Sequence, residues 1–169
     1  MAHRTNRTNR THPHRHARRC PSGRTQHLID LENLAGGPFP NAGVALARLD
    51  EYLEASDWQP GDLGVVATNR WLHRRIAFDL PRHLRALPVI GKDGADLALL
   101  GWTSPADVAK RFDRLVVGSG DHAFVELVAG AAALGVPAWV VGVTGTISAR
   151  LEAAATRTVV LDRAVAAAA

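Results

Sequence analysis

The 169-residue sequence has the length of one domain, and its single cysteine, Cys20, excludes an internal disulfide and a multi-cysteine zinc site. The net charge of +4 is unevenly divided. Residues 1–24 carry seven arginines and no carboxylate, whereas residues 25–169 carry 13 basic and 16 acidic side chains. The sequence pI of about 10.2 therefore reflects the tail and is no evidence for a nucleic-acid-binding fold.

Residues 1–24 are expected to be a basic, disordered tail, because they hold almost nothing apolar to bury. Two readings of the tail stay open: its arginines contact phosphates without regard to sequence, or it is a solvated extension without a role. A free thiol at Cys20 favours a reducing compartment, hence the cytoplasm. No apolar run approaches a membrane span, and no apolar segment follows the basic start as in a secretory signal.

One domain is expected over 25–169, opening with the short apolar strand 27–30, which ends in an acid. Residues 42–55 have apolar positions on one face of a helix, and the turn Pro60-Gly61-Asp62 separates them from a strand over 63–67. A helix over 71–80 follows, ended by Pro81, and then a strand over 87–90.

In the second half, the loop 91–94 leads into a helical apolar stretch, 95–100. Ser104 and Pro105 have the residue types of an N-cap and a first helical position. The remaining elements are expected as a strand over 115–118, a helix over 123–134, a strand over 137–143, a helix over 146–155 and a strand over 158–161.

Strands that are apolar throughout and alternate with helices predict a mainly parallel sheet covered on both faces. The expected fold is therefore α/β, a three-layer α/β/α Rossmann-like sandwich. In such sheets, ligands bind beyond the carboxyl ends of the strands. Asp30 and Asp121 follow two of these ends, and Asp96 begins a helical stretch after a glycine-containing loop.

Three carboxylates repel one another unless a cation lies between them, and Mg²⁺ prefers oxygen ligands. Each acid also has a simpler explanation. Asp30 and Asn33 could cap the following loop or helix, Asp121 could be the N-cap of the helix after it, and Asp96 could be a first-turn acid. The combined placement of the three acids favours a metal site.

Three segments carry a resemblance to a known family. His-Leu-Ile-Asp30-Leu-Glu-Asn33-Leu resembles the opening of NYN domains, a branch of the PIN-like nucleases. The segment 91–99, Gly-Lys-Asp-Gly-Ala-Asp-Leu-Ala-Leu, looks like that family's Lys-Gly-x-Asp-hydrophobic segment with one residue shifted. The segment 115–124 is similar to its strand–Ser-Gly-Asp-x-Asp-Phe motif, and the Leu-Gly and strand of 134–141 follow as expected.

The resemblance implies a PIN-like sandwich that hydrolyses RNA, and the RNA is expected to be single-stranded. It implies Mg²⁺ or Mn²⁺ held by the catalytic Asp30, Asp96 and Asp121, with water attacking a phosphodiester. Asn33 is expected to orient the Asp30 side or contact substrate. Ser119 is expected to support the loop or the metal waters, and Lys92 of the second motif is expected to contact substrate.

The sequence departs from the family pattern at two positions. The second acid of the Ser-Gly-Asp-x-Asp motif is Ala123, and a further aspartate expected after Asp96 aligns with Trp102. These losses weaken the case for a second metal and for turnover. Inward-pointing Glu32, Asp93 or Glu126 could compensate.

The segment 70–85 contains five arginines and one acid, which suggests an RNA-backbone surface that includes Arg70, Arg74 and Arg75. Trp71 or Phe78 could stack a base there, although core packing is the expected role of Trp71. His27 begins a strand, and no partner for it can be identified from the sequence.

Three functions follow from these observations. The first is a metal-dependent endoribonuclease, and the second is a catalytically weakened or inactive RNA-binding module. The third is a nucleotide-binding Rossmann-like enzyme, which is disfavoured because the first strand precedes no Gly-x-Gly-x-x-Gly and the chain has no P-loop. The oligomeric state stays open, including a dimer through the apolar last strand.

Overall fold

The computed structural model describes residues 23–91 and 93–163. The predicted basic tail, apart from its last two residues, lies outside the described residues. Lys92, proposed above as a substrate contact, lies outside them too.

The described strands form one six-stranded, entirely parallel sheet in the order β3-β2-β1-β4-β5-β6. Their bounds are β1 Thr25–Asp30, β2 Leu63–Asn69, β3 Leu84–Val89, β4 Arg114–Gly118, β5 Ala138–Val143 and β6 Arg157–Leu161. From β1 the chain adds β2 and β3 on one side of the sheet, and from β4 it adds β5 and β6 on the other side. The carboxyl ends of β1 and β4 therefore flank the switch point at which such sheets bind ligands.

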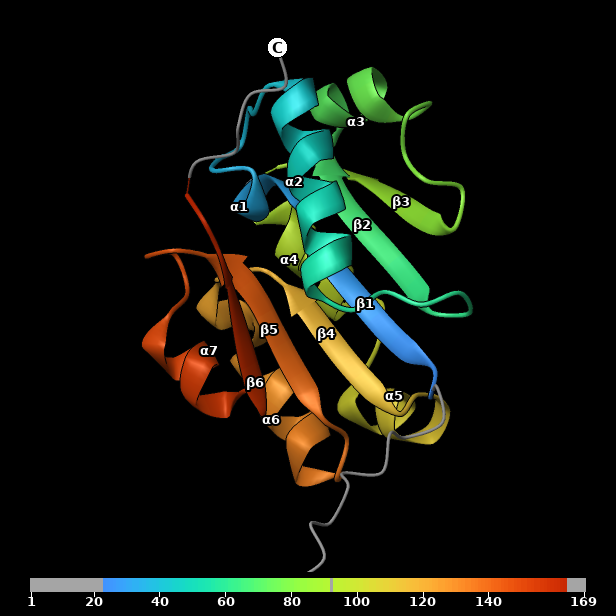
Figure 1. The fold of residues 1–169 in the computed structure, drawn as a ribbon, viewed down its shortest axis with the longest axis vertical. Helices are drawn as coiled ribbons and strands as arrows, with labels where there is room; N and C mark the ends of the chain where they lie inside the picture. The colour runs from blue at the N-terminus through green and yellow to red at the C-terminus, as the bar shows by residue number, and fades with distance from the viewer. Residues whose placement is uncertain (1–22, 92, 164–169) are drawn as a thin grey trace, which may run out of the picture.

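Helices cover both faces of the sheet, which confirms the expected three-layer α/β/α sandwich (Figure 1). One face is covered by α1 (Leu31–Leu34), α2 (Ala42–Ala55) and α3 (Arg70–Ile76). The other is covered by α4 (Gly94–Leu100), α5 (Pro105–Arg111), α6 (Val125–Ala133) and α7 (Ala149–Ala154), with the 3-10 turn η1 (His122–Phe124) leading into α6.

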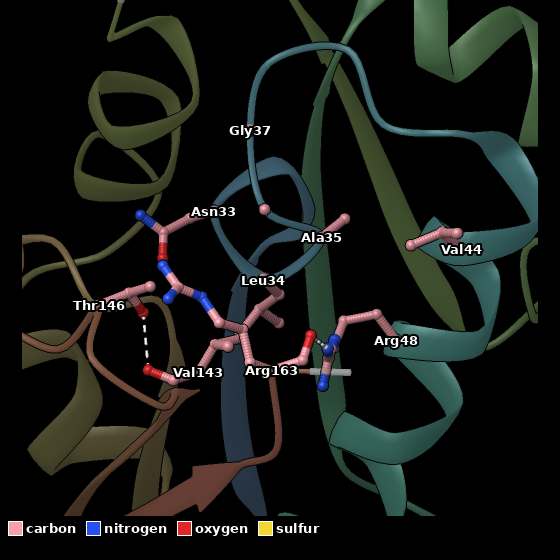
Figure 2. A pocket seen from close by; sticks show the side chains of 10 residues that line it. Asn33, Leu34, Ala35, Gly37, Val44, Arg48, Val143, Thr146 and Arg163 are labelled. Carbon is pink, nitrogen blue, oxygen red and sulfur yellow. Dashed lines mark hydrogen bonds between the residues drawn. The ribbon is translucent and has the colours of Figure 1, made fainter. Parts of the chain in front are cut away.

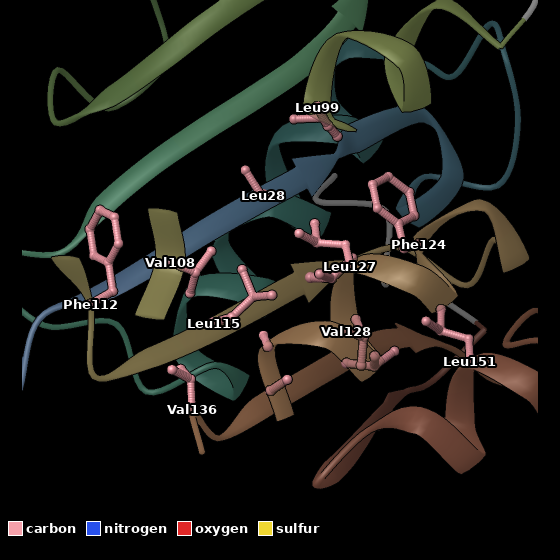
Figure 3. Packing of buried hydrophobic residues seen from close by; sticks show 14 of the residues in the cluster. Leu28, Leu99, Val108, Phe112, Leu115, Phe124, Leu127, Val128, Val136 and Leu151 are labelled. Atoms are coloured by element: carbon pink, nitrogen blue, oxygen red, sulfur yellow. The ribbon is translucent and has the colours of Figure 1, made fainter. Parts of the chain in front are cut away.

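Alternate residues of the central strands supply the two cores. Leu28 of β1 and Val117 of β4 pack under α4 to α7, whereas Ile29 and Val116 face α1 to α3. In the first of these cores, Phe124 and Leu151 converge on the sheet from different helices (Figure 3). Burial on both faces explains why these strands are apolar throughout.

The predicted helix over 42–55 is confirmed at both ends. Helix α3 is shorter than predicted: it ends at Ile76, and the N–H groups of Asp79 and Leu80 then both donate to the Ile76 carbonyl in a turn that leads to Pro81. Helix α7 also begins later than predicted, since Ser148 caps it by accepting a hydrogen bond from the Leu151 N–H. Pro88 lies in β3, an edge strand, where a missing N–H is tolerated.

His27 is completely buried at the amino end of the sheet, and the structure identifies partners that the sequence did not. Its Nδ1 lies 3.0 Å from the Tyr52 hydroxyl, and its Nε2 lies 3.3 Å from Asp62 Oδ2. This end is opposite the carboxyl edge, so His27 belongs to the core. Among the described helices, none is long and apolar enough to cross a membrane.

Candidate functional site

The first two predicted acids lie at the switch point of the sheet. Asp30 is the last residue of β1, and Asp121 follows β4 after Ser119 and Gly120. Because β1 and β4 are paired and parallel, with Ile29 opposite Gly118, both carboxylates emerge at the same edge.

The third acid, Asp96, reaches this edge from the first turn of α4. Asp30, Asp96 and Asp121 line one cavity of about 280 Å³ at the carboxyl edge, called here the acidic cavity. Three segments that are far apart in the sequence therefore contribute one carboxylate each to one hollow.

Both strand-end acids also cap the structures that follow them. Asp30 Oδ1 accepts a hydrogen bond from the Asn33 N–H at 3.1 Å, and Asp121 Oδ1 accepts one from the Ala123 N–H at 2.8 Å. The simpler explanations of these acids as caps are thus correct as far as they go. Capping engages one oxygen of each carboxylate, and the carboxyl group of Asp30 also shares a side-chain hydrogen bond with Asp96.

Two polar residues hold the acids in position. Asn33 lines the acidic cavity, and its side-chain oxygen accepts a hydrogen bond from the Gly120 N–H at 2.9 Å. Ser119 is fully buried, and its hydroxyl accepts a hydrogen bond from the Asp121 N–H at 3.2 Å. Asn33 could contact a substrate, whereas Ser119 is placed to support the loop.

Burial raises the pKa of the Asp30 carboxyl to about 7, and the negative charges of Asp96 and Glu32 act in the same direction. The hydrogen bond from the Asn33 N–H opposes this rise. Asp30 is only 6% exposed, so little water reaches its charge. The acidic cavity therefore disfavours an ionised Asp30 unless a positive charge enters.

The ionised form of Asp96 is disfavoured as well. Burial raises its pKa and the charge of Asp121 raises it further, whereas a side-chain hydrogen bond with Asp30 opposes this rise. Its Oδ1 is buried and has no hydrogen-bond partner among the described residues. A buried carboxylate oxygen without a donor is costly, and a cation or a bound water would satisfy it.

The described residues, Gly23–Gly91 and Asp93–Arg163, contain no group of three or more His, Cys, Asp or Glu side chains close enough to hold a metal ion together. The acids of the cavity could therefore serve an ion that takes one or two carboxylates and completes its shell with water and phosphate, as Mg²⁺ commonly does. Asp96, with its unpartnered oxygen, fits this role, and buried Asp30 is its neighbour.

The other acids named from the sequence are divided by the structure. Glu32 and Asp93 line the acidic cavity, whereas Glu126 is exposed on α6 and does not. Glu32 is already engaged, because its carboxylate accepts a hydrogen bond from the Asn69 N–H. Asn69, which also lines the cavity, was missed by the sequence analysis; as an Asn at a strand end it was indistinguishable from an ordinary helix cap.

Neither departure from the family pattern introduces a side chain into the acidic cavity. Ala123 and Trp102 are both absent from its lining. Trp102 lies beneath the guanidinium of Arg85, at 4.8 Å from the ring centre. Arg70, Arg74 and Arg75 are exposed on α3 and also lie outside the lining.

The expectation that Trp71 packs in the core is wrong, since 41% of its surface is exposed. Its apolar neighbours on α3, Leu72 and Ile76, fill the core instead. Trp71 does not itself line the acidic cavity, but it follows Asn69, the N-cap of α3 and a lining residue, by two positions.

A larger cavity, of about 540 Å³, shares Asn33 and Gly37 with the acidic cavity, and its lining is shown in Figure 2. It is bordered by Arg48 of α2 and by Arg163 beyond β6. Arg48 is 2% exposed; its Nη1 pairs with Glu51 at 2.6 Å, and its Nη2 donates to the Arg163 carbonyl at 3.4 Å. These bonds tie α2 to the chain after β6.

Neither a protein-family model nor a curated protein matches the chain. A solved structure of a protein of unknown function from Vibrio parahaemolyticus is similar, with a TM-score of 0.52 and 16% sequence identity. The match covers 83% of this chain and 94% of that one. The likeness is one of fold.

Proposed function

We propose that the protein is a divalent-metal-dependent endoribonuclease of the NYN branch of PIN-like nucleases, acting in the cytoplasm. One observation carries the proposal: Asp30, Asp96 and Asp121, named from three separate sequence motifs, line a single cavity at the switch point of the sheet. Strand pairing alone brings Asp30 and Asp121 to this edge, whereas Asp96 is added from the first turn of α4.

In this proposal, Asp96 and Asp30 bind Mg²⁺ or Mn²⁺, which supplies charge stabilisation at the phosphodiester and activates water when bound. Asp121 contributes the third carboxylate, on the side of the cavity where the substrate binds. Its loop is held by Ser119, which accepts a hydrogen bond from the Asp121 N–H, and by Asn33, which accepts one from the Gly120 N–H. Exposed Arg70 and Arg74 of α3 bind the RNA backbone beyond the cavity.

The test is cleavage of single-stranded RNA by the full chain in Mn²⁺, compared with Asp96→Asn. We expect the variant to lose at least about 100-fold in rate, because charge stabilisation at the reacting group is the largest catalytic contribution. Asp50→Asn is the matched control: Asp50 is an exposed aspartate on α2, away from the cavity lining. Equal cleavage by all three proteins would contradict the proposal.

A second readout does not depend on turnover. Mn²⁺ should raise the melting temperature of the wild type, because an ion that binds only the folded state stabilises it. The rise should vanish in Asp96→Asn and persist in Asp50→Asn. No rise in the wild type would argue against a metal at Asp96.

The alternative is a PIN-like RNA-binding module without catalysis. It is favoured by Ala123 in place of an expected acid and by the lack, among the described residues, of a three-ligand group. This alternative expects RNA binding that weakens steeply with salt, no metal-dependent cleavage, and loss of most affinity when residues 1–24 are deleted.

A further inference from the structure

We infer that the acidic cavity is served by a base-stacking site made of Phe39 and Trp71, which selects single-stranded over duplex RNA. The inference rests on the proposed RNA substrate but not on hydrolysis. Phe39 belongs to the loop between α1 and α2, and Trp71 belongs to the first turn of α3. The two residues are called here the aromatic pair.

The aromatic pair is exposed to an unusual degree. Phe39 is 73% and Trp71 41% exposed, although both side chains are among the most apolar available. Their rings meet edge to face, with centres 6.0 Å apart and planes at 83°. Exposing two adjacent aromatic rings to water is unfavourable, and burying them against a partner would be favourable. Such a pair therefore indicates a contact surface.

The aromatic pair adjoins the acidic cavity on two sides. Pro38, next to Phe39, lines the cavity, and so does Asn69, two residues before Trp71. The Asn69 side-chain amide donates a hydrogen bond to the Pro38 carbonyl, which fixes the loop to the start of α3. Phe39 also lines a neighbouring cavity of similar volume, about 280 Å³, that shares Gly37 and Pro38 with the acidic cavity.

The charges around the aromatic pair suit a nucleic-acid strand. The Arg75 guanidinium lies 4.3 Å from the Trp71 ring centre, and Arg70 and Arg74 are exposed on the same helix. No carboxylate lies within α3. The carboxylates of the acidic cavity repel phosphate, so a strand needs cationic and stacking contacts beside it.

A stacking site of this kind distinguishes the two forms of RNA. In a duplex the base faces are already stacked and unavailable, whereas an unpaired base can turn onto an aromatic ring.

The test is fluorescence anisotropy of a labelled single-stranded RNA and of its duplex, with the full chain in EDTA, which prevents metal-dependent cleavage. About 0.3 M salt suppresses the contribution of the basic tail. We expect Phe39→Ala and Trp71→Ala each to weaken single-strand binding by roughly tenfold, as removal of a stacking ring typically does, and to leave duplex binding unchanged within about twofold.

Two further variants separate stacking from folding. Trp71→Phe retains a ring and should retain most of the single-strand affinity. Leu134→Ala is the matched control, because Leu134 is an exposed apolar residue at the end of α6 and lines no cavity that includes Asn69 or Pro38. It should bind both RNAs like the wild type.

The inference is overturned if the alanine variants bind single-stranded RNA normally, if they lose duplex binding equally, or if the wild type binds no single-stranded RNA. The result is different if only the proposed ribonuclease activity is wrong. In that case the wild type leaves RNA intact in Mn²⁺, yet the aromatic pair still governs single-strand binding in EDTA.

Discussion

The side-chain oxygen of Asn33 accepts a hydrogen bond from the backbone N–H of Gly120 at 2.9 Å. Asn33 lies just after β1 and Gly120 just after β4, so this bond joins the two loops at the point where the strand order reverses. The loops carry Asp30 and Asp121, and the bond therefore sets the spacing of two of the three acids.

Asn33→Ala should separate the two loops. It leaves the Gly120 N–H without its acceptor, and we expect a loss of about 1–2 kcal/mol in the free energy of unfolding. RNA cleavage should fall at least about tenfold, because small displacements of reacting groups are costly. Asn41→Ala is the control, since Asn41 likewise accepts a backbone bond, from Gly43 at 2.8 Å, away from the cavity. Comparable loss of cleavage in both variants would contradict the positioning role.

Gly120→Ala should damage the same loop through packing. An added Cβ would lie 2.7 Å from the Thr146 carbonyl carbon, so the backbone must move. We expect a loss of about 2–3 kcal/mol in urea unfolding. The control Gly43→Ala, in α2, meets only Asn41 Oδ1 at 3.3 Å and should be neutral or slightly stabilising. A fully stable Gly120→Ala would show that the loop is looser than its contacts indicate.

Asp30→Asn should stabilise the protein. Burial raises the pKa of Asp30 from 3.8 to about 7, so the folded state holds a proton that the unfolded state has released, and stability falls as pH rises between these values. Removing the charge should add about 2 kcal/mol at pH 7.5 without divalent ions. Chemical unfolding at pH 5 and 7.5 measures this. A variant less stable than the wild type at pH 7.5 would refute it.

His27 should make the free energy of unfolding depend on pH in the direction opposite to Asp30, and His27→Gln should remove this dependence. Burial lowers the pKa of His27 from 6.5 despite the hydrogen bond and the charge of Asp62, and Arg114 lowers it further. The unfolded state therefore takes up a proton first, and the wild type should lose stability as pH falls below about 6.5. The variant should lack this loss when unfolding is measured from pH 7.5 to 5.

The two slopes oppose each other, so the wild-type profile alone cannot test either. The difference between wild type and His27→Gln should grow smaller towards pH 5, whereas Asp30→Asn should lose its advantage over the same range. Parallel profiles for the wild type and His27→Gln would mean that His27 titrates alike in both states.

Much of the architecture follows from local sequence alone. Strands such as Leu115–Gly118 are apolar on both faces, which requires a sheet covered on both sides, and Ser104-Pro105 starts α5 through an ordinary cap. The ends of α3 and α7 were less predictable, because tertiary contacts and a Ser148 cap decide where the helical bonds stop.

The sequence by itself determined the fold class and the three acids, because apolar periodicity and strand-end carboxylates are local features. Only the tertiary structure decided that Asp30, Asp96 and Asp121 line one cavity, since strand order brings β1 beside β4. It also decided that His27 meets Asp62 and that Trp71 faces solvent beside Phe39. These contacts join residues up to about ninety positions apart, and no local pattern in the chain encodes such proximity.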